Sequence, residues 1–318
     1  MNKVLETTKF VVDNSTSVKI NQEKLAEFSK KFNHGNLPHW LSASPISYAH
    51  LSDEDKLNFL LVFNSTSFCY WGDPKWTIEY KGEKYDGSWA MVASIFRALD
   101  EGKPIFDAKY RATISRENYQ EILRGNVQIP LFEERLKITR DVASLLLEKY
   151  SGDFGKMVKS AEGDASKLLM MITSQLPCFD DTESYKGQTI YFYKRAQLLI
   201  EDINSTFAGE GYGELRGLEE FTACADYKLP QSLRKLGIFS YSKDLEEKID
   251  KLIQLPKGSP EEVEIRANTI WSVEMIKEEL RKAGKNFSSM SINDHLWLMG
   301  QTKSPDDKPY HRTLTTAY

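Results

Sequence analysis

The sequence is poor in cysteine, and it lacks any long apolar run. Only three cysteines occur among 318 residues, far apart and without a CxxC pair: Cys69, Cys178 and Cys224. This pattern argues against a disulfide framework or a zinc cluster, and it fits a reducing cytoplasm. No stretch of about 18 apolar residues is present, so we expect no transmembrane helix. The N-terminal residues also lack the basic and apolar segments of a secretion signal, which again indicates a cytoplasmic protein.

A surplus of basic charge is also absent. The chain has 42 Lys and Arg residues against 46 Asp and Glu residues, a formal net charge of −4. A protein that coats duplex DNA or RNA needs excess Lys and Arg to neutralise phosphates, so a nucleic-acid polymer is not the expected partner. A small anionic ligand is compatible with this balance, because a few local cations suffice for one phosphate group.

The motifs of several enzyme classes are missing. The five histidines form no HExxH motif and no pair spaced by four residues, and no GxSxG motif occurs. No glycine-rich phosphate loop follows a predicted strand, and strands and helices do not alternate. These absences disfavour Rossmann and P-loop enzymes, α/β-hydrolases and helix-borne zinc sites. We therefore expect no metal or other cofactor, and the remaining plausible chemistry uses carboxylates.

Helical periodicity dominates what is present. In residues 76–85, an alternating stretch, a turn at Lys81-Gly82 and a returning stretch predict a β-hairpin. Apolar spacing, the capping residues Asn21, Ser52 and Ser115, and proline positions predict helices over 22–32, 52–63, 89–99, 115–123, 130–150, 165–173, 188–204, 218–225, 230–236, 243–254, 260–282 and 291–299. The sequence therefore predicts a mainly α fold with one small β-hairpin. No linker or repeat is visible, so we expect a single domain over residues 1–318, less regular over 1–20.

Two aspartates occupy places where a carboxylate can be structural or functional. Asp226 stands between two predicted helices, shortly before Pro230, which suits the first position of the second helix. A helix N-terminus offers positive potential and free N–H groups. Asp226 is thus either an ordinary helix cap or a carboxylate held for chemistry. Asp294, near the start of the last predicted helix, allows the same two interpretations.

Glu274 interrupts an apolar stripe on the longest predicted helix. Helical spacing puts this carboxylate on one face with Val263, Ala267 and Ile270. A buried carboxylate needs a partner, because burial of an unpaired charge is unfavourable. The partner is either a ligand or a core residue such as Arg266.

Basic and aromatic residues supply further candidates. Lys194 lies opposite the apolar side of its predicted helix, so it faces either solvent or a cleft that holds an anion. His311 is a second, weaker candidate for an anion contact. Aromatic residues flank the hairpin, with Phe68 and Trp71 before it and Trp89 after it. They form either core or a stacking wall for a planar base.

Seven short motifs follow one another along the chain. They are Asn64–Trp71, Tyr85–Trp89, Arg97–Gly102, Phe192–Gln197, Ala225–Gln231, Glu264–Glu274 and Pro309–Arg312. Each motif is weak alone, but the ordered series is specific. It resembles the queuosine salvage protein family, the queuosine 5′-phosphate N-glycosidases, and the resemblance spans about residue 20 to the C-terminus.

The resemblance implies a helical fold related to the helix-hairpin-helix DNA glycosylases. It also implies hydrolysis of the N-glycosidic bond of queuosine 5′-monophosphate, which releases queuine for salvage into tRNA modification. Asp226 matches the catalytic aspartate of the family, and Lys194 matches a substrate-site lysine. Four residues before Trp297 the family often has a carboxylate, whereas this chain has Asn293, followed by Asp294.

The implied chemistry assigns roles to further residues. Cleavage of a nucleoside bond passes through an oxocarbenium-like sugar, which an ionised carboxylate stabilises without a cofactor. For the phosphate we expect Lys194 first, and Arg195 or His311 second. For the base we expect stacking on Phe68, Trp71 or Tyr227, and hydrogen bonds to Glu274 or Asp294. The general acid for the departing base is not identified.

The expected partner is therefore a small nucleotide, bound by a monomer that needs neither a membrane nor a nucleic-acid polymer. Two other classes stay open. One is a binding module for modified nucleotides that has no turnover, and the other is a DNA-repair base glycosylase. The balance of charge disfavours the DNA-repair enzyme.

Overall fold

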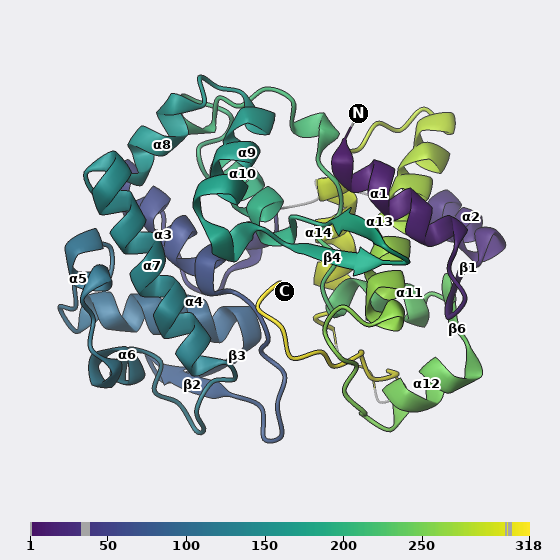
Figure 1. Cartoon of the computed structure of the whole chain (residues 1–318), viewed down its shortest axis with the longest axis horizontal. Helices are drawn as coiled ribbons and strands as arrows, with labels where there is room; N and C mark the ends of the chain where they lie inside the picture. Colours follow the sequence, from purple (N-terminus) through teal and green to yellow (C-terminus); the bar gives the residue numbers. More distant parts are fainter. Residues whose placement is uncertain (1, 33–38, 303, 305–306) are drawn as a thin grey trace.

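The computed structural model describes residues 2–32, 39–302, 304 and 307–318, and helices dominate it (Figure 1). The α-helices of the described residues are α1 (Lys3–Asp13), α2 (Gln22–Lys31), α3 (Asp53–Thr66), α4 (Gly87–Asp100), α5 (Ala108–Ala112), α6 (Arg116–Ile122), α7 (Phe132–Tyr150), α8 (Phe154–Ser160), α9 (Ala165–Gln175), α10 (Lys194–Thr206), α11 (Lys228–Lys235), α12 (Lys243–Asp250), α13 (Pro260–Lys282) and α14 (Ser289–Met299). Short 3-10 helices are η1 (Trp40–Ala43), η2 (Pro177–Phe179), η3 (Gly211–Gly213) and η4 (Leu218–Glu220). The expected mainly α fold is confirmed, while its kinship with DNA glycosylases stays a prediction.

The strands of the described residues form three separate antiparallel pairs. They are β1 (Val18–Ile20) with β6 (Phe239–Tyr241), β2 (Thr77–Tyr80) with β3 (Glu83–Asp86), and β4 (Thr182–Tyr185) with β5 (Gln188–Tyr191). The predicted hairpin is β2–β3, in which Ile78 lies opposite Tyr85. The prediction of a single small sheet is incomplete, because Val18–Ile20 has only three residues and Thr182–Tyr185 is polar up to its last residue, so neither strand shows a clear alternating pattern.

Three helices begin directly after a capping residue that the sequence predicts. The side chains of Asn21, Ser52 and Ser115 accept hydrogen bonds from backbone N–H groups in the first turns of α2, α3 and α6. Ser259 does the same for α13. These caps satisfy N–H groups that have no partner within the helix, which is a local effect that the sequence alone can reveal.

The predicted helix over 188–204 is wrong in its first part. Gln188–Tyr191 forms strand β5, and helix α10 begins only at Lys194. Lys186 and Gly187 both have positive φ angles, of 47° and 80°. A two-residue turn of this kind matches the twist of an antiparallel pair, so β5 folds back on β4.

The predicted helix over 218–225 is also wrong. Only its first three residues form η4, and the chain then runs to α11 without regular structure. Side chains of other elements take up the backbone hydrogen bonds of this stretch. Gln197 Oε1 accepts the N–H of Thr222 at 2.8 Å, and Asn293 Oδ1 accepts the N–H of Cys224 at 2.9 Å. Tertiary hydrogen bonds therefore replace the helical ones.

Three further local predictions change. The helix expected from Pro130 begins at Phe132, because Leu131 has a left-handed backbone with a φ angle of 54°. The short helices α5 and α8 are present but were not predicted from the sequence. Helix α5 has only five residues, too few turns for a clear apolar period, and α8 contains Gly155 and has no side-chain cap, whereas Ser115 marks the start of α6.

The N-terminal segment is regular, contrary to the expectation for residues 1–20. Val4, Thr8 and Val11 lie at helical spacing on α1 and are buried. Helix α1 packs against α13 and β5, and Trp271 Nε1 of α13 donates a hydrogen bond to Thr8 Oγ1 at 3.1 Å. The sequence of α1 mixes apolar and polar residues, and only this narrow stripe is buried, so its helical period is weak.

Figure 1 shows two sides of the molecule, one formed by the middle of the chain and the other by its two ends. Helices α3 to α10 lie on one side and share the largest hydrophobic core, while α1, α2 and α11 to α14 lie on the other side. The last residues return between the two sides, and Tyr318 is buried there. Among the described residues, no helix has the length and apolar character that a membrane span requires.

Candidate active site

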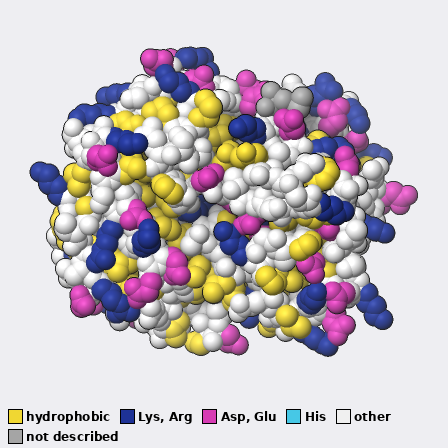
Figure 2. All heavy atoms as spheres, in the orientation of Figure 1, with side chains coloured by type: hydrophobic (Ala, Val, Ile, Leu, Met, Phe, Trp, Pro, Cys, Tyr) yellow, Lys and Arg dark blue, Asp and Glu magenta, His cyan; other side chains and the backbone are white. Residues whose placement is uncertain are grey.

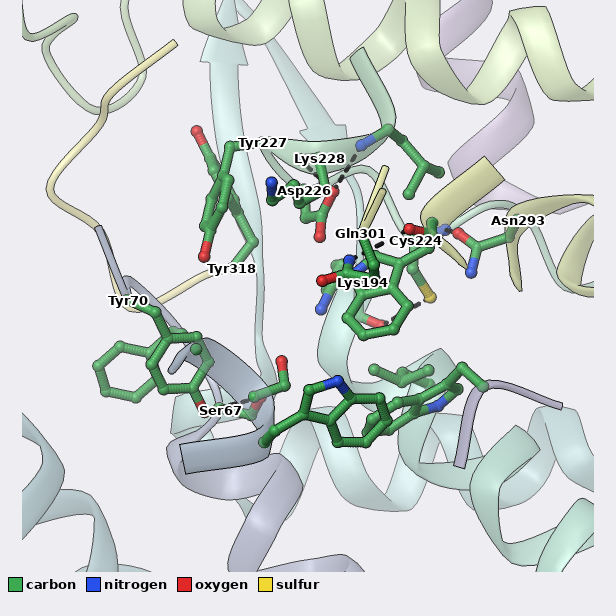
Figure 3. Close-up of a pocket in the computed structure, with 18 of the residues that line it drawn as sticks. Ser67, Tyr70, Lys194, Cys224, Asp226, Tyr227, Lys228, Asn293, Gln301 and Tyr318 are labelled. Atoms are coloured by element: carbon green, nitrogen blue, oxygen red, sulfur yellow. Dashed lines mark hydrogen bonds between the residues drawn. The ribbon is translucent and has the colours of Figure 1, made fainter. Parts of the chain in front are cut away.

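A cavity opens between the two sides, where α3, α4 and α10 face α11 and α14 (Figure 3). Its volume is about 780 Å³, a value that includes the open mouth. The polar residues that line it are Ser67, Lys75, Asp86, Ser88, Lys194, Asp226, Lys228, Asn293, Asp294 and Gln301. The aromatic residues that line it are Trp40, Phe63, Phe68, Tyr70, Trp89, Tyr227, Trp297 and Tyr318. An aromatic lining with a few charged groups suits a planar ligand with a polar edge.

Asp226 stands at the N-terminus of α11 and is only 8% exposed. Its Oδ1 atom accepts the N–H groups of Lys228 and Leu229 at 2.7 and 2.9 Å. Its Oδ2 atom accepts no hydrogen bond from the described residues, and Figure 3 shows the side chain at the cavity, between Tyr227 and Lys194. Burial raises the pKa of Asp226, and the charge of Lys194 and the two N–H groups partly oppose this rise. Asp226 is therefore both a helix cap and a carboxylate with one oxygen available to a ligand.

Lys194 is the first residue of α10, and it lines the same cavity. Tyr193 before it has a left-handed backbone with a φ angle of 50°, which separates the strand β5 from the helix. The N–H of Lys194 donates to Asp181 Oδ2 at 3.2 Å, and the residue is 8% exposed. Of the two places expected for Lys194, solvent or a cleft, the structure places it at the cleft.

Asn293 and Asp294 of α14 both line the cavity, and they have different partners. Asn293 holds the chain before Asp226 through the N–H of Cys224. Asp294 Oδ2 accepts the N–H of Trp40 at 3.1 Å, and Asn293 Nδ2 donates to Asp294 Oδ1 at 3.1 Å. Burial raises the pKa of Asp294 to about 6, although the charge of His39 and these hydrogen bonds oppose the rise.

Acidic side chains surround His39 behind Asp294. The Nε2 atom of His39 lies 3.2 Å from Asp202 Oδ1 and 4.0 Å from Asp294 Oδ2. Burial lowers the pKa of His39, but the nearby carboxylates outweigh this effect and the pKa lies above its ordinary value. Burial, followed by the charges of Asp294 and Asp202, raises the pKa of Glu201 to about 7, while His39 opposes the rise. The cluster therefore retains protons at pH values where isolated carboxylates are ionised.

Three tryptophans form one wall of the cavity. The rings of Trp40 and Trp89 stack with centroids 5.5 Å apart, and Trp297 meets both edge-on at 5.5 and 5.7 Å. Sequence reasoning did not propose Trp40, Trp297 or Tyr318 as site residues. Trp297 could have been found, because it follows Asn293 by about one helical turn and therefore shares its face.

Comparison with known proteins identifies the family. A family model described as queuosine salvage protein matches residues 47–318. The chain belongs to the queuosine salvage protein family. Two relatives named queuosine 5′-phosphate N-glycosylase/hydrolase come from Sphaerobacter thermophilus, at 40% identity over 99% of this chain and 97% of the relative, and from Mus musculus, at 35% identity over 98% of each. A third relative of that name, from Schizosaccharomyces pombe, is 29% identical over 93% of this chain and 91% of the relative.

The structure brings part of the expected queuosine salvage site together. The expected residues that line the cavity are Phe68, Lys194, Asp226, Tyr227 and Asp294. Apart from the neighbours Asp226 and Tyr227, they come from segments far apart in the sequence. Their meeting at one cavity is therefore a result of the tertiary fold.

Trp71 and Arg195 lie outside the cavity lining, contrary to expectation. Trp71 is buried, its Nε1 donates to Thr313 O at 3.1 Å, and the guanidinium of Arg312 lies over its ring. Arg195 is buried and donates to the backbone oxygens of Asn64, Ser65 and Cys178. Both residues therefore connect core segments instead of lining the cavity.

Glu274 and His311 also lie outside the lining. The Glu274 carboxylate lies 2.5 Å from the Lys277 ammonium and accepts a hydrogen bond from Ser289, so its partner is neither a ligand nor Arg266. His311 is buried, and its Nε2 lies 3.1 Å from Tyr318 Oη. Burial, together with the charge of Arg266, lowers the pKa of His311 to about 3, so the imidazole is neutral and does not supply a positive charge for an anion.

Proposed function

We propose that this chain hydrolyses the N-glycosidic bond of queuosine 5′-monophosphate and releases the base queuine. The observation that carries the proposal is the buried Asp226 carboxylate, which has one oxygen fixed by two N–H groups and the other at an aromatic cavity. The names of the relatives from bacteria and eukaryotes support the same activity and the same substrate. We also propose that the protein acts as a monomer in the cytoplasm.

The carboxylate at the cavity suits the charge that this reaction develops. As the bond between C1′ and the base nitrogen breaks, its electrons leave with the base and the sugar becomes oxocarbenium-like. Asp226 Oδ2 stabilises that positive charge and accepts a proton from water as the water oxygen bonds to C1′. A proton must also reach the departing base, and the donor is a residue or water not identified. The carboxylate needs no rearrangement during the reaction, because Oδ1 is held by the start of α11.

The rest of the cavity offers partners for the base and the phosphate. The aromatic wall can stack on a planar deazaguanine, and Asp294 can accept N–H groups from its hydrogen-bonding edge. The Lys194 ammonium can donate a charge-assisted hydrogen bond to an oxygen of the 5′-phosphate. Phe68 and Tyr227 stay candidates for ring contacts because they line the cavity.

The alternatives differ in what happens to the nucleotide. On the face drawn in Figure 2, the basic side chains of the described residues are interspersed with acidic ones and form no continuous strip, which disfavours a DNA-repair glycosylase. A binding module without turnover would retain the nucleotide intact. Incubation with queuosine 5′-monophosphate followed by mass spectrometry tests the proposal. Free queuine and ribose 5-phosphate in equal amounts are expected, and recovery of intact nucleotide would overturn the proposed activity.

A further inference from the structure

A buried ion pair lies behind the cavity without lining it. Arg266 of α13 donates from both terminal nitrogens to Asp181, which stands between η2 and β4, at 3.0 and 2.6 Å. Arg266 is 0% exposed and Asp181 is 8% exposed. A bidentate pair with this burial fixes the orientation of both side chains, because two parallel hydrogen bonds prevent rotation.

The pair contacts the backbone beside both charged residues of the proposed reaction. Asp181 Oδ2 accepts the N–H of Lys194 at 3.2 Å, at the first residue of α10. Arg266 Nε donates to Ala225 O at 3.4 Å, on the residue immediately before Asp226. One ion pair therefore bridges the segment that carries the lysine and the segment that carries the catalytic candidate.

The same guanidinium also contacts a third cavity residue. Its central carbon lies 4.7 Å from the ring centroid of Tyr318 and 3.8 Å from that of Phe192. Tyr318 Oη donates to Glu262 Oε1 at 2.8 Å, one helical turn before Arg266 on α13. The Tyr318 side chain, which lines the cavity, is thus held by two residues of one helix.

We propose that Arg266 and Asp181 are positioning residues that set the separation between the Lys194 ammonium and the Asp226 carboxylate and hold Tyr318 at the cavity wall. The effect of the pair on catalysis rests on the proposed function, whereas its effect on the separation of Lys194 and Asp226 does not. Lys194 and Asp226 lie on segments about 30 residues apart in the sequence. Local structure alone cannot set the distance between the Lys194 ammonium and the Asp226 carboxylate, whereas an anchor that contacts both segments can.

The proposal predicts a change in the ionisation of Asp226. The positive charge of Lys194 opposes the effect of burial on the pKa of Asp226. If the anchor weakens and Lys194 moves away, the pKa of Asp226 rises, and more Asp226 is protonated at a given acidic pH. The acid limb of the pH profile for kcat/KM then moves to higher pH. Misplacement of the reacting groups also lowers kcat on the order of 10²-fold.

The test compares two variants of the pair with a control on the same helix. Asp181→Asn removes the charge without changing the size, and Arg266→Lys keeps the charge but loses the two-pronged geometry. The control is Glu264→Gln, because Glu264 is also buried on α13 but accepts Ser17 N–H at 2.6 Å and Tyr185 Oη at 2.8 Å, away from the cavity. Circular dichroism and thermal unfolding establish that each variant is folded.

Kinetics with queuosine 5′-monophosphate give the first readout. Both variants of the pair are expected to lower kcat more than they change KM. The acid limb of the pH profile for kcat/KM is expected to move to higher pH. Glu264→Gln is expected to lower stability without moving the acid limb. If the pair were purely structural, the folded fraction of Asp181→Asn and of Arg266→Lys would have the kcat and the acid limb of the parent protein. That result would overturn the proposal.

A second readout does not depend on turnover. Carbon-13 NMR of the aspartate carboxyl groups follows the titration of Asp226, whose signal is identified by its loss in Asp226→Asn. A pKa of Asp226 that rises in the variants of the pair and not in Glu264→Gln supports the positioning role even if the parent protein releases no queuine. An unchanged pKa in a folded variant overturns it, and Arg266→Lys decides the question if Asp181→Asn does not fold.

Discussion

Individual side chains at the cavity often serve two purposes, and Asp226 shows why a sequence cannot choose between them. As a helix cap it needs one acceptor oxygen, to which the backbone N–H groups of Lys228 and Leu229 donate. A carboxylate has a second oxygen, and here that atom is available at the cavity. The structural and functional interpretations of Asp226 are therefore compatible rather than exclusive.

Asp226→Asn and Asp226→Ala should separate the two roles. The amide retains an acceptor for the cap but loses the charge, so we expect a fall in kcat of roughly 10²-fold or more with nearly normal stability. Alanine loses both, and we expect an additional loss of about 1 kcal/mol in the free energy of unfolding. Rates of queuine release and urea denaturation give the two quantities. A near-parental rate for Asp226→Asn would show that the catalytic role is wrong.

Lys194 should determine the preference for the phosphorylated substrate. Lys194→Ala is expected to reduce kcat/KM for queuosine 5′-monophosphate by about 10-fold to 100-fold, and that for the free nucleoside by much less. The gap between the two substrates should therefore narrow. Lys24→Ala, which changes an exposed lysine of α2, is the control. Equal losses on both substrates would place Lys194 elsewhere in the site than at the phosphate.

Glu201 should make stability depend on pH. Its pKa is raised from 4.5 to about 7, first by burial, so ionisation opposes folding as the pH rises through this interval. Glu201→Gln removes that effect because its amide is neutral. At about pH 8 we expect the variant to be more stable than the parent by about 2 kcal/mol, with no such gain near pH 4. Denaturant unfolding at both pH values measures this, with Glu148→Gln on the exposed face of α7 as control. A gain in the stability of Glu201→Gln that is independent of pH would show that ionisation of Glu201 is not its cause.

At the scale of elements, the N-terminal helix shows how a segment expected to be less regular can contribute to the core. Helix α1 presents a narrow buried stripe to α13 and leaves its other residues accessible to solvent. Strand β1, which follows it, pairs with β6. The N-terminal segment thus closes the side of the molecule that carries α11 and α14, and both of these helices contribute residues to the cavity.

Val11→Ala tests this packing of α1. The side chain is 0% exposed, so its truncation should lower the free energy of unfolding by about 2 kcal/mol. Glu6→Ala on the exposed face of the same helix should change stability by less than about 0.5 kcal/mol. Thermal or urea unfolding of both variants gives the comparison. Equal stabilities for Val11→Ala and the parent would mean that α1 does not contribute to the core.

At the scale of the whole molecule, the cavity lies between segments from both sides, with the C-terminal tail between them. The two charged candidates at the cavity, Lys194 and Asp226, are each only 8% exposed, so a ligand has to enter the cavity to contact them. The formal net charge of −4 provides no general attraction for a polyanion. Both properties favour a free nucleotide over a nucleotide within a polymer.

Intact tRNA that contains queuosine should therefore not be a substrate. We expect no queuine after incubation with the intact tRNA, and release after the same tRNA has been digested to 5′-monophosphates with a nuclease. Mass spectrometry of the free base measures both. Release from intact tRNA at a rate similar to that from the digest would show that the polymer enters the site.

The sequence by itself determined the features that depend on neighbours along the chain. Caps at Asn21, Ser52 and Ser115, and the turn of the β2–β3 hairpin, act over a few residues and were predicted correctly. Ordered motifs also indicated the family, which comparison with known proteins confirms. Neither kind of signal requires knowledge of which distant segments meet.

The tertiary structure alone decided which buried residues line the cavity. Lys194 and Arg195 are neighbours in one motif, but successive side chains on a helix point about 100° apart, so the first faces the cavity and the second holds core carbonyls. Phe68, Trp71 and Trp89 all belong to the aromatic residues that flank the predicted hairpin, but Trp71 lies outside the cavity lining. A periodic pattern shows that a side chain is buried. Whether it is buried against a ligand cavity or against solid core depends on segments that the fold brings from elsewhere in the chain.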